Sequence, residues 1–172
     1  MAAKKIGILT GGGDAPGLNA VIRAVTVKGI ESGYEIVGFE EGWRGLLKKM
    51  SRSLDVTDVE DIHMLGGTIL GSSRTNVSKV ENGFEIAKNN LSELGIHALI
   101  AAGGEDTLGV ALKLYNAGAN VVGVPKTIDN DVNATDYTFG FDTAINRVSD
   151  FLEMLRTTTE SHRRIMVVEI MG

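Results

Sequence analysis

Short apolar segments rich in β-branched residues recur along this chain and constrain its fold more than any other feature. They occupy residues 5–10, 34–39, 97–102, 120–124 and 165–170. Several lack the polar alternation of a half-exposed strand, so they are predicted to be strands buried on both faces. The segments between them, 19–32, 81–94, 107–117 and 141–155, fit crossover helices. The alternation predicts an α/β fold, a doubly wound and mainly parallel sheet with helices on both faces.

The length of 172 residues predicts a single domain, and a hydrophobic content of 43% is enough to form its core. Segment 40–73 has the least regular pattern. A short β-ribbon or an extra helical turn is expected there.

Composition excludes several classes of function. Asp and Glu outnumber Lys and Arg by 22 to 17, and the formal net charge is −5. A nucleic-acid or anionic-membrane partner is therefore disfavoured. The absence of cysteine excludes disulfides, thiolate metal sites and a cysteine nucleophile. No apolar run approaches the ~18 residues of a membrane span and no signal-peptide pattern opens the chain, so a cytoplasmic location is expected.

A glycine-rich loop, 10–17, follows the first predicted strand and precedes a predicted helix. Glycines let the backbone approach a ligand closely, and a helix N-terminus offers free N–H groups, so the loop suits phosphate. Leu18 and Asn19 stand where a P-loop requires Lys and Ser or Thr, and the loop is not G-x-G-x-x-G. The pattern favours neither a Walker NTPase nor a typical dinucleotide fold.

A second loop, 103–107, places Glu105 and Asp106 after two glycines at the start of another helix. Acidic residues in the first turn can simply stabilise the helix through its dipole, without any role in binding. The preceding glycines favour phosphate binding instead, in which a carboxylate shares Mg²⁺ with phosphate oxygens.

A third loop, 125–131, follows another predicted strand. It can be a simple turn, since Pro, Asn and Asp all favour turns. It also offers a cation in Lys126, a hydroxyl in Thr127 and carboxylates in Asp129 and Asp131, which together could deprotonate an alcohol beside a phosphate. A functional loop is favoured over a simple turn, because three such loops are expected at one edge of the sheet.

The loops and their surroundings resemble the 6-phosphofructokinase family. The matching stretches, in the family's order, are 7–23, 66–74, 103–109, 125–131, 135–143 and 161–172. The resemblance implies transfer of a phosphoryl group to the C1 hydroxyl of fructose 6-phosphate, giving fructose 1,6-bisphosphate, in a homo-oligomer (dimer or tetramer). It further implies that residues 1–172 form the Rossmann-like, phosphoryl-donor-binding N-terminal domain. The family's second domain, which binds the sugar phosphate, is largely absent from this chain.

The resemblance also assigns roles to individual residues. It implies that Asp129 is the general base and that Lys126, Thr127 and Asp106 belong to the catalytic set. It implies that Glu105 holds Mg²⁺, with Asp131 as a second metal candidate. The donor phosphates are expected at Gly13, Arg74, Gly104 and Thr107, and the sugar substrate at Lys126, Thr127, Asp129, Arg164, Met171 and Gly172. Arg164 matches an arginine that reaches the sugar 6-phosphate of a neighbouring subunit.

Asp106 and Lys126 together mark the pyrophosphate-using members of that family, whereas many ATP-using members have Gly at both positions. A carboxylate at position 106 repels the α-phosphate of a nucleotide, while pyrophosphate ends before it. An ammonium at position 126 can neutralise charge on the transferring phosphates. The resemblance therefore predicts pyrophosphate as donor, with an ATP-dependent enzyme as the alternative.

Some questions remain open from the sequence. Glu105 stands where Asp is commoner, and its longer side chain could bind Mg²⁺ directly or through water. Trp43 could anchor the core or line the donor pocket. A Gly-Gly-acid-x-Thr loop also occurs in NAD kinases and diacylglycerol kinases, and a non-catalytic phosphate-binding module is a further alternative.

Overall fold

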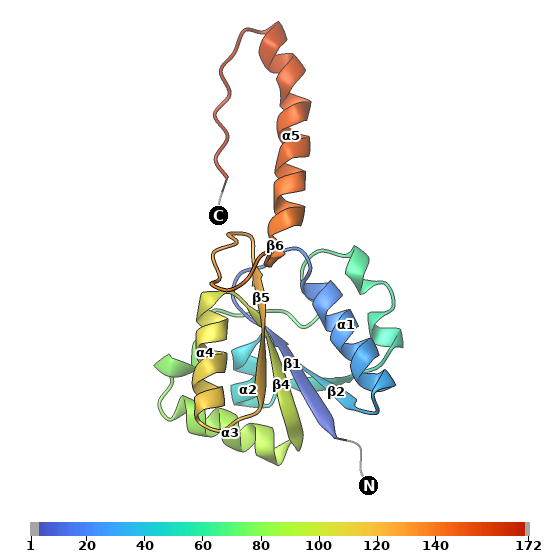
Figure 1. Cartoon of the computed structure of the whole chain (residues 1–172), viewed down its shortest axis with the longest axis vertical. Coiled ribbons are helices and arrows are strands. Elements are labelled where there is room, and N and C mark those ends of the chain that lie inside the picture. Colours follow the sequence, from blue (N-terminus) through green and yellow to red (C-terminus); the bar gives the residue numbers. More distant parts are fainter. Residues whose placement is uncertain (1–3, 171–172) are drawn as a thin grey trace.

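The computed structural model describes residues 4–170, which form one mixed sheet with helices on both faces (Figure 1). The strands are β1 (Lys5–Thr10), β2 (Glu35–Phe39), β3 (Ser51–Leu54), β4 (Ile96–Gly103), β5 (Val121–Thr127) and β6 (Phe139–Gly140). The α-helices are α1 (Leu18–Glu31), α2 (Trp43–Lys48), α3 (Gly83–Glu93), α4 (Glu105–Asn116) and α5 (Phe141–Ser161). Short 3₁₀ helices occur at η1 (Thr57–Val59), η2 (Ile62–Met64) and η3 (Val77–Lys79).

The strand order is β3-β2-β1-β4-β5-β6. All neighbouring pairs are parallel except β2 and β3, which are antiparallel. From β1 the chain first adds β2 and β3 on one side of the sheet, and then β4, β5 and β6 on the other side. This order of strands is the doubly wound arrangement. The predicted fold class is confirmed.

The apolar middle of the central strand β1 has both of its faces covered. On β1, Ile8 and Leu9 are both completely buried, and they belong to different clusters. Ile8 packs with Leu18 and Ile22 of α1, whereas Leu9 packs with residues of α2, α3 and α4. The continuous apolar runs therefore reflect two separate cores, one on each face.

The irregular segment 40–73 contains both features expected for it. Helix α2 supplies the extra helical turns, and β3 forms a short antiparallel ribbon with β2. The 3₁₀ helices η1 and η2 then pack against α1.

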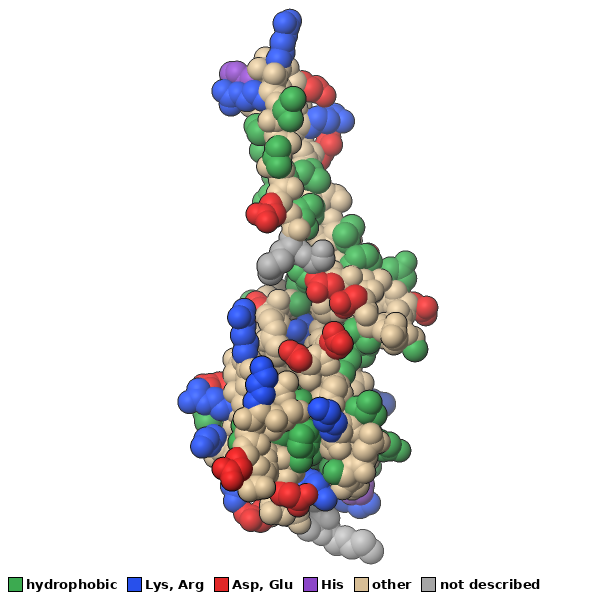
Figure 2. Space-filling model, turned by 90° about the vertical axis from the view of Figure 1, so that its left-hand side faces the viewer, with side chains coloured by type: hydrophobic (Ala, Val, Ile, Leu, Met, Phe, Trp, Pro, Cys, Tyr) green, Lys and Arg blue, Asp and Glu red, His purple; other side chains and the backbone are tan. Residues whose placement is uncertain are grey.

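The C-terminal part of the chain differs from the prediction. Residues 165–170 are extended but not paired as a strand, and α5 has no buried residue. Helix α5 projects away from the sheet instead of covering it, and hydrophobic side chains spread along its surface (Figures 1 and 2). A β-branched run forms a strand only where a sheet edge pairs with it, and Ile165 and Val167 are 93% and 92% exposed.

No helix within residues 4–170 combines the length and the apolar character that crossing a lipid bilayer requires.

We expect Gly45→Ala to lower the free energy of unfolding by about 3 kcal/mol, because a Cβ at position 45 of α2 would lie 1.9 Å from the Glu40 carbonyl oxygen. The matched control is Gly109→Ala in α4, whose Cβ would meet nothing within 4 Å. That substitution should raise stability by up to about 1 kcal/mol, because alanine has the higher helix propensity. Urea unfolding measures both, and an equal effect of the two variants would contradict the packing around α2.

Candidate functional site

A polar hollow of about 500 Å³ lies at the carboxyl ends of β1, β4 and β5, where the three predicted loops meet. Parallel strands bring the loops that follow them to the same edge of the sheet. The hollow is lined by Gly12, Gly13, Asp14, Ala15, Gly104, Glu105, Asp106, Thr107, Lys126, Thr127, Ile128, Asp129 and Asp131. We call this space the central hollow.

Thr107 holds the first two loops together. Its side chain is 2% exposed and fills the space that two glycines leave open. A Cβ at Gly11 would lie 2.6 Å from the Thr107 Oγ1, and a Cβ at Gly103 would lie 2.4 Å from the Thr107 Cβ. Larger residues at either glycine would therefore force the first turn of α4 away from β1.

The third loop begins later than predicted, because β5 continues through Thr127 and includes Lys126. Lys126 joins the end of β5 to the first loop. Its side chain is 3% exposed, and its Nζ donates a hydrogen bond of 2.5 Å to the Gly13 carbonyl oxygen. Burial lowers the pKa of the Lys126 ammonium from its ordinary value of 10.5, while the nearby carboxylates of Asp14 and Asp129 act in the opposite direction. The hollow thus contains a buried cation between exposed carboxylates.

The third loop has the internal bonds of a turn as well as functional groups. Asn130 has a positive φ of 53°, and its side-chain oxygen accepts from the Thr138 backbone N–H at 2.9 Å. The Thr138 hydroxyl donates to the Thr127 carbonyl at 2.6 Å, and the Asp129 N–H donates to the Thr127 hydroxyl at 3.1 Å. These bonds fix the backbone while the Asp129 and Asp131 carboxylates stay exposed. The turn and the chemical interpretation of this loop are therefore compatible.

A second hollow of about 400 Å³ adjoins the central hollow. Both are lined by Gly12, Gly13, Asp106 and Thr107. The second hollow is also lined by Trp43, Ser73, Arg74, Thr75, Asn76 and Lys79. Asp106 therefore lies on the border between the two spaces, and we call the second space the outer hollow.

Trp43 is both a core residue and part of the outer hollow. Its ring is 2% exposed and packs with Leu9 and Phe39, yet the residue lines that hollow. Its Nε1 has no hydrogen-bond partner among the described residues. The core role predicted for Trp43 is confirmed, and its contact with the donor stays a prediction.

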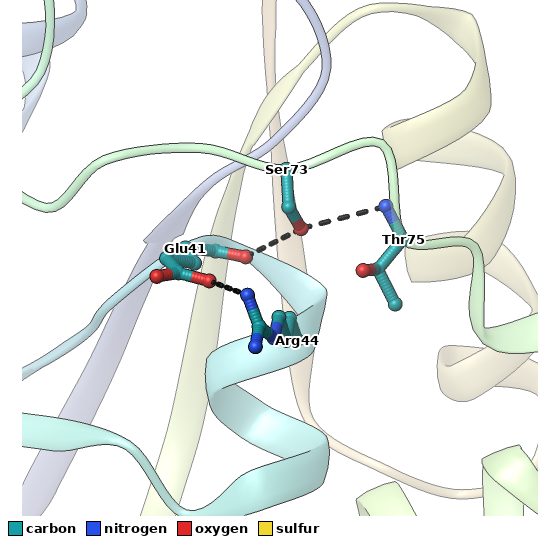
Figure 3. Close-up of polar contacts among 4 residues, drawn as sticks. All are labelled: Glu41, Arg44, Ser73 and Thr75. Atoms are coloured by element: carbon teal, nitrogen blue, oxygen red, sulfur yellow. Dashed lines mark hydrogen bonds and ion pairs between the residues drawn. The ribbon is translucent and has the colours of Figure 1, made fainter.

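The segment that carries Arg74 is fixed to the loop after β2. The Ser73 hydroxyl donates to the Glu41 carbonyl at 2.7 Å and lies near the Thr75 N–H (Figure 3). Glu41 in turn forms an ion pair of 2.5 Å with Arg44 of α2. This attachment positions Arg74 at the outer hollow, while its side chain remains exposed.

Asn19 stands where a P-loop would have Ser or Thr. In the structure it is buried and binds segment 65–69. Its amide donates to the Leu65 and Gly66 carbonyls, and its oxygen accepts from the Ile69 N–H at 2.8 Å. The sequence did not indicate this role, because such a contact joins residues about fifty positions apart.

Most predicted site residues come together, but one group does not. Those that line the central hollow are Gly13, Gly104, Glu105, Asp106, Thr107, Lys126, Thr127, Asp129 and Asp131. Arg164 lies just beyond α5, exposed and remote from both hollows. Met171 and Gly172 lie outside the described residues. Asp14 also lines the central hollow, but it was not predicted as a site residue, although it directly follows three glycines in the first loop.

The carboxylates do not form a metal site by themselves. Within residues 4–170, no group of three or more His, Cys, Asp or Glu side chains is arranged to hold a metal ion. Carboxylates that line the same hollow could nevertheless share a divalent cation with the oxygens of a ligand.

A doubly wound sheet with glycine loops and helix N-termini at a polar hollow is typical of domains that bind phosphate-bearing ligands. Residues 5–172 match the sequence profile of the family described as phosphofructokinase. The chain belongs to the phosphofructokinase family.

Two curated relatives show the range of names in this family. A protein of Amycolatopsis methanolica named pyrophosphate–fructose 6-phosphate 1-phosphotransferase is 64% identical over 169 residues, or 98% of this chain and 50% of that protein. A protein of Streptomyces coelicolor named ATP-dependent 6-phosphofructokinase 2 is 52% identical, with the same coverage. Both names denote phosphate-transferring enzymes, and the chain spans about half the length of these relatives.

The solved structure of phosphofructokinase from Saccharomyces cerevisiae shares the fold. It aligns with a TM-score of 0.87 and 33% identity over 98% of this chain and 26% of that one.

We expect Asp14→Asn to lower the pKa of Lys126 further, because the Asp14 carboxylate stabilises the ammonium. The wild-type pKa should already lie below 10.5, so the ammonium is lost as the pH rises through that lowered value. An NMR titration of the Lys126 side chain measures both values. Asp61→Asn, which removes an exposed carboxylate outside both hollows, should leave the pKa unchanged. A wild-type value at or above 10.5 would show that burial does not dominate.

Proposed function

We propose that this chain is the donor-binding domain of an enzyme that transfers a phosphoryl group from pyrophosphate to the C1 hydroxyl of fructose 6-phosphate. The observation that carries the proposal is the position of Asp106 on the border between the central and outer hollows. The name of the Amycolatopsis methanolica relative supports the same donor.

Asp106 discriminates donors by charge and length. A nucleoside triphosphate whose terminal phosphate reaches Lys126 and Asp129 has to extend from the central hollow toward the outer one. Its α-phosphate then passes the Asp106 carboxylate, and two like charges in a partly enclosed site repel. Pyrophosphate carries only two phosphates and ends before that contact.

Lys126 and Asp129 supply complementary chemistry in the central hollow. The Asp129 carboxylate accepts the proton of the sugar hydroxyl, and the Lys126 ammonium balances negative charge on the transferring and leaving phosphates. Catalysis of phosphoryl transfer depends mainly on such positioning and charge neutralisation. Thr127 contacts the sugar, and Gly13, Gly104, Thr107 and Arg74 contact the donor.

Magnesium fits the oxygen ligands of the central hollow. Glu105, with Asp131 as a second candidate, would hold Mg²⁺ together with pyrophosphate oxygens and water, since Mg²⁺ takes one or two carboxylates in such sites. When bound, the ion neutralises part of the phosphate charge. The helical position of Glu105 in the first turn of α4 supports its placement beside a phosphate.

The sugar substrate requires groups that lie outside these two hollows. The sugar-phosphate site belongs to a second domain, and Arg164 acts at the site of a neighbouring subunit in a homo-oligomer. The exposed position of Arg164 beyond α5 supports such an action outside its own chain. We place the enzyme in the cytoplasm, as a part of sugar phosphate metabolism.

An ATP-dependent 6-phosphofructokinase is the second candidate. The Streptomyces coelicolor relative with that name supports it, as do the Arg74 and Lys79 cations of the outer hollow, which suit the phosphates of a nucleotide.

The donor is tested by calorimetry on this chain with magnesium pyrophosphate and a magnesium complex of a non-hydrolysable ATP analogue. Wild type should bind pyrophosphate at least about tenfold more tightly, and Asp106→Gly should reduce that preference by about tenfold. Two like charges about 4 Å apart repel by roughly 1 to 4 kcal/mol between bulk water and a protein surface, and about 1.4 kcal/mol corresponds to a tenfold change in affinity. Asp61→Asn is the matched control and should leave the preference unchanged. A wild-type preference for the ATP analogue would establish the second candidate.

The base is tested by turnover in a fusion of this chain to the second half of the Amycolatopsis methanolica relative. Asp129→Ser should lower kcat by at least about 100-fold with either donor, because serine cannot accept the proton at neutral pH. Thermal melting by circular dichroism checks that the variant folds. Turnover within about threefold of wild type would remove Asp129 from the mechanism.

A further inference from the structure

Two carbonyl oxygens in the first glycine loop are held by side chains from distant parts of the chain. The Gly12 oxygen accepts from the Ser72 hydroxyl at 2.8 Å, and the Gly13 oxygen accepts from the Lys126 ammonium at 2.5 Å. The two donors lie 60 and 113 positions away from their acceptors. The orientation of consecutive peptide planes in this loop is therefore fixed from outside it.

The Ser72 contact determines where the Gly13 N–H points. The Gly12 carbonyl and the Gly13 N–H belong to one planar trans peptide, so they point in opposite directions. Ser72 is not among the residues that line the central or the outer hollow, whereas Gly13 lines both. Since the carbonyl points toward Ser72, the N–H is directed away from it, and no acceptor for this N–H occurs among the described residues.

The loop needs such a contact because glycine alone does not select one orientation. Gly12 has a φ of +80°, and at Gly13 a Cβ would meet nothing within 4 Å. Neither position restrains the peptide between them by packing. If that peptide turned over, its carbonyl oxygen would face an arriving anion in place of an N–H donor, which would change attraction into repulsion.

Ser72 is itself attached to fixed elements. The preceding Gly71 carbonyl accepts from the Thr10 hydroxyl at the end of β1 at 2.9 Å. The Leu70 carbonyl accepts from the Glu41 N–H at 2.8 Å, and Ser73 donates back to the Glu41 carbonyl at 2.7 Å. Ser72 therefore donates to the loop from a segment bonded on both sides of it.

We propose that Ser72 is a positioning residue, which holds the Gly12 carbonyl so that the Gly13 N–H is directed at a phosphate oxygen of the donor. Lys126 does the same for the next peptide while it serves as the cation of the site. The ligand that this arrangement recognises is an inorganic phosphate or pyrophosphate group, so the proposal rests on the proposed function.

The test compares Ser72→Ala, which removes the hydroxyl, with Ser72→Thr, which keeps it. Calorimetry on this chain with magnesium pyrophosphate should show about tenfold weaker binding for Ser72→Ala and binding within about twofold of wild type for Ser72→Thr, as expected for one hydrogen bond to a charged group. In the ligand-free chain, the NMR order parameter of the Gly13 amide should be lower in Ser72→Ala alone, because the peptide that carries it is then no longer held. Ser92→Ala, an exposed serine of α3, is the control for both measurements.

The two readouts separate the proposals. If wild type binds no pyrophosphate, the proposed donor is wrong, and the order parameter of the Gly13 amide still decides whether Ser72 orders the loop. An unchanged order parameter of the Gly13 amide in Ser72→Ala would overturn the positioning role. Equal losses of affinity in the Ala and Thr variants would also overturn it, because the hydroxyl would then not be the cause.

Discussion

Burial of one ammonium group determines the geometry of this site. Placing the Lys126 charge away from water is unfavourable unless hydrogen bonds and opposite charges compensate for it. The Gly13 carbonyl supplies the first, and Asp14 and Asp129 supply the second. Because these partners come from the loops after β1 and β5, the lysine can be accommodated only when both loops are in position. The charge distribution of the site therefore depends on the correct folding of both loops at this edge of the sheet.

Much of this arrangement could be predicted from the sequence, because it follows from local patterns. The continuous apolar run of β1 predicted a strand with the observed bounds, and glycines after strands predicted ligand-facing loops. Parallel pairing then requires that the segments that contain Asp106 and Asp129 share one edge, because each follows a parallel strand of the sheet. The convergence of these residues in the central hollow follows from topology more than from any single contact.

The parts that could not be predicted depend on contacts between distant residues or on missing partners. Ser72 and Asn19 form hydrogen bonds across 60 and about 50 positions, and neither has a local pattern that distinguishes it from an ordinary polar residue. Residues 165–170 have the composition of a strand, but composition cannot tell whether a sheet edge is there to receive them. Segment 141–155 was likewise predicted correctly to be helical, but the prediction that it packs on the sheet as a crossover helix was wrong.

The exposure of Asp106 has a consequence for how this family could diversify. The side chain lies in the first turn of α4 at a hollow, and it belongs to neither of the two clusters that form the core. A substitution there changes the field that a ligand meets but removes no packing. If Asp106 selects the donor as proposed, single substitutions at this position can change which phosphate compound binds without lowering the stability of the fold.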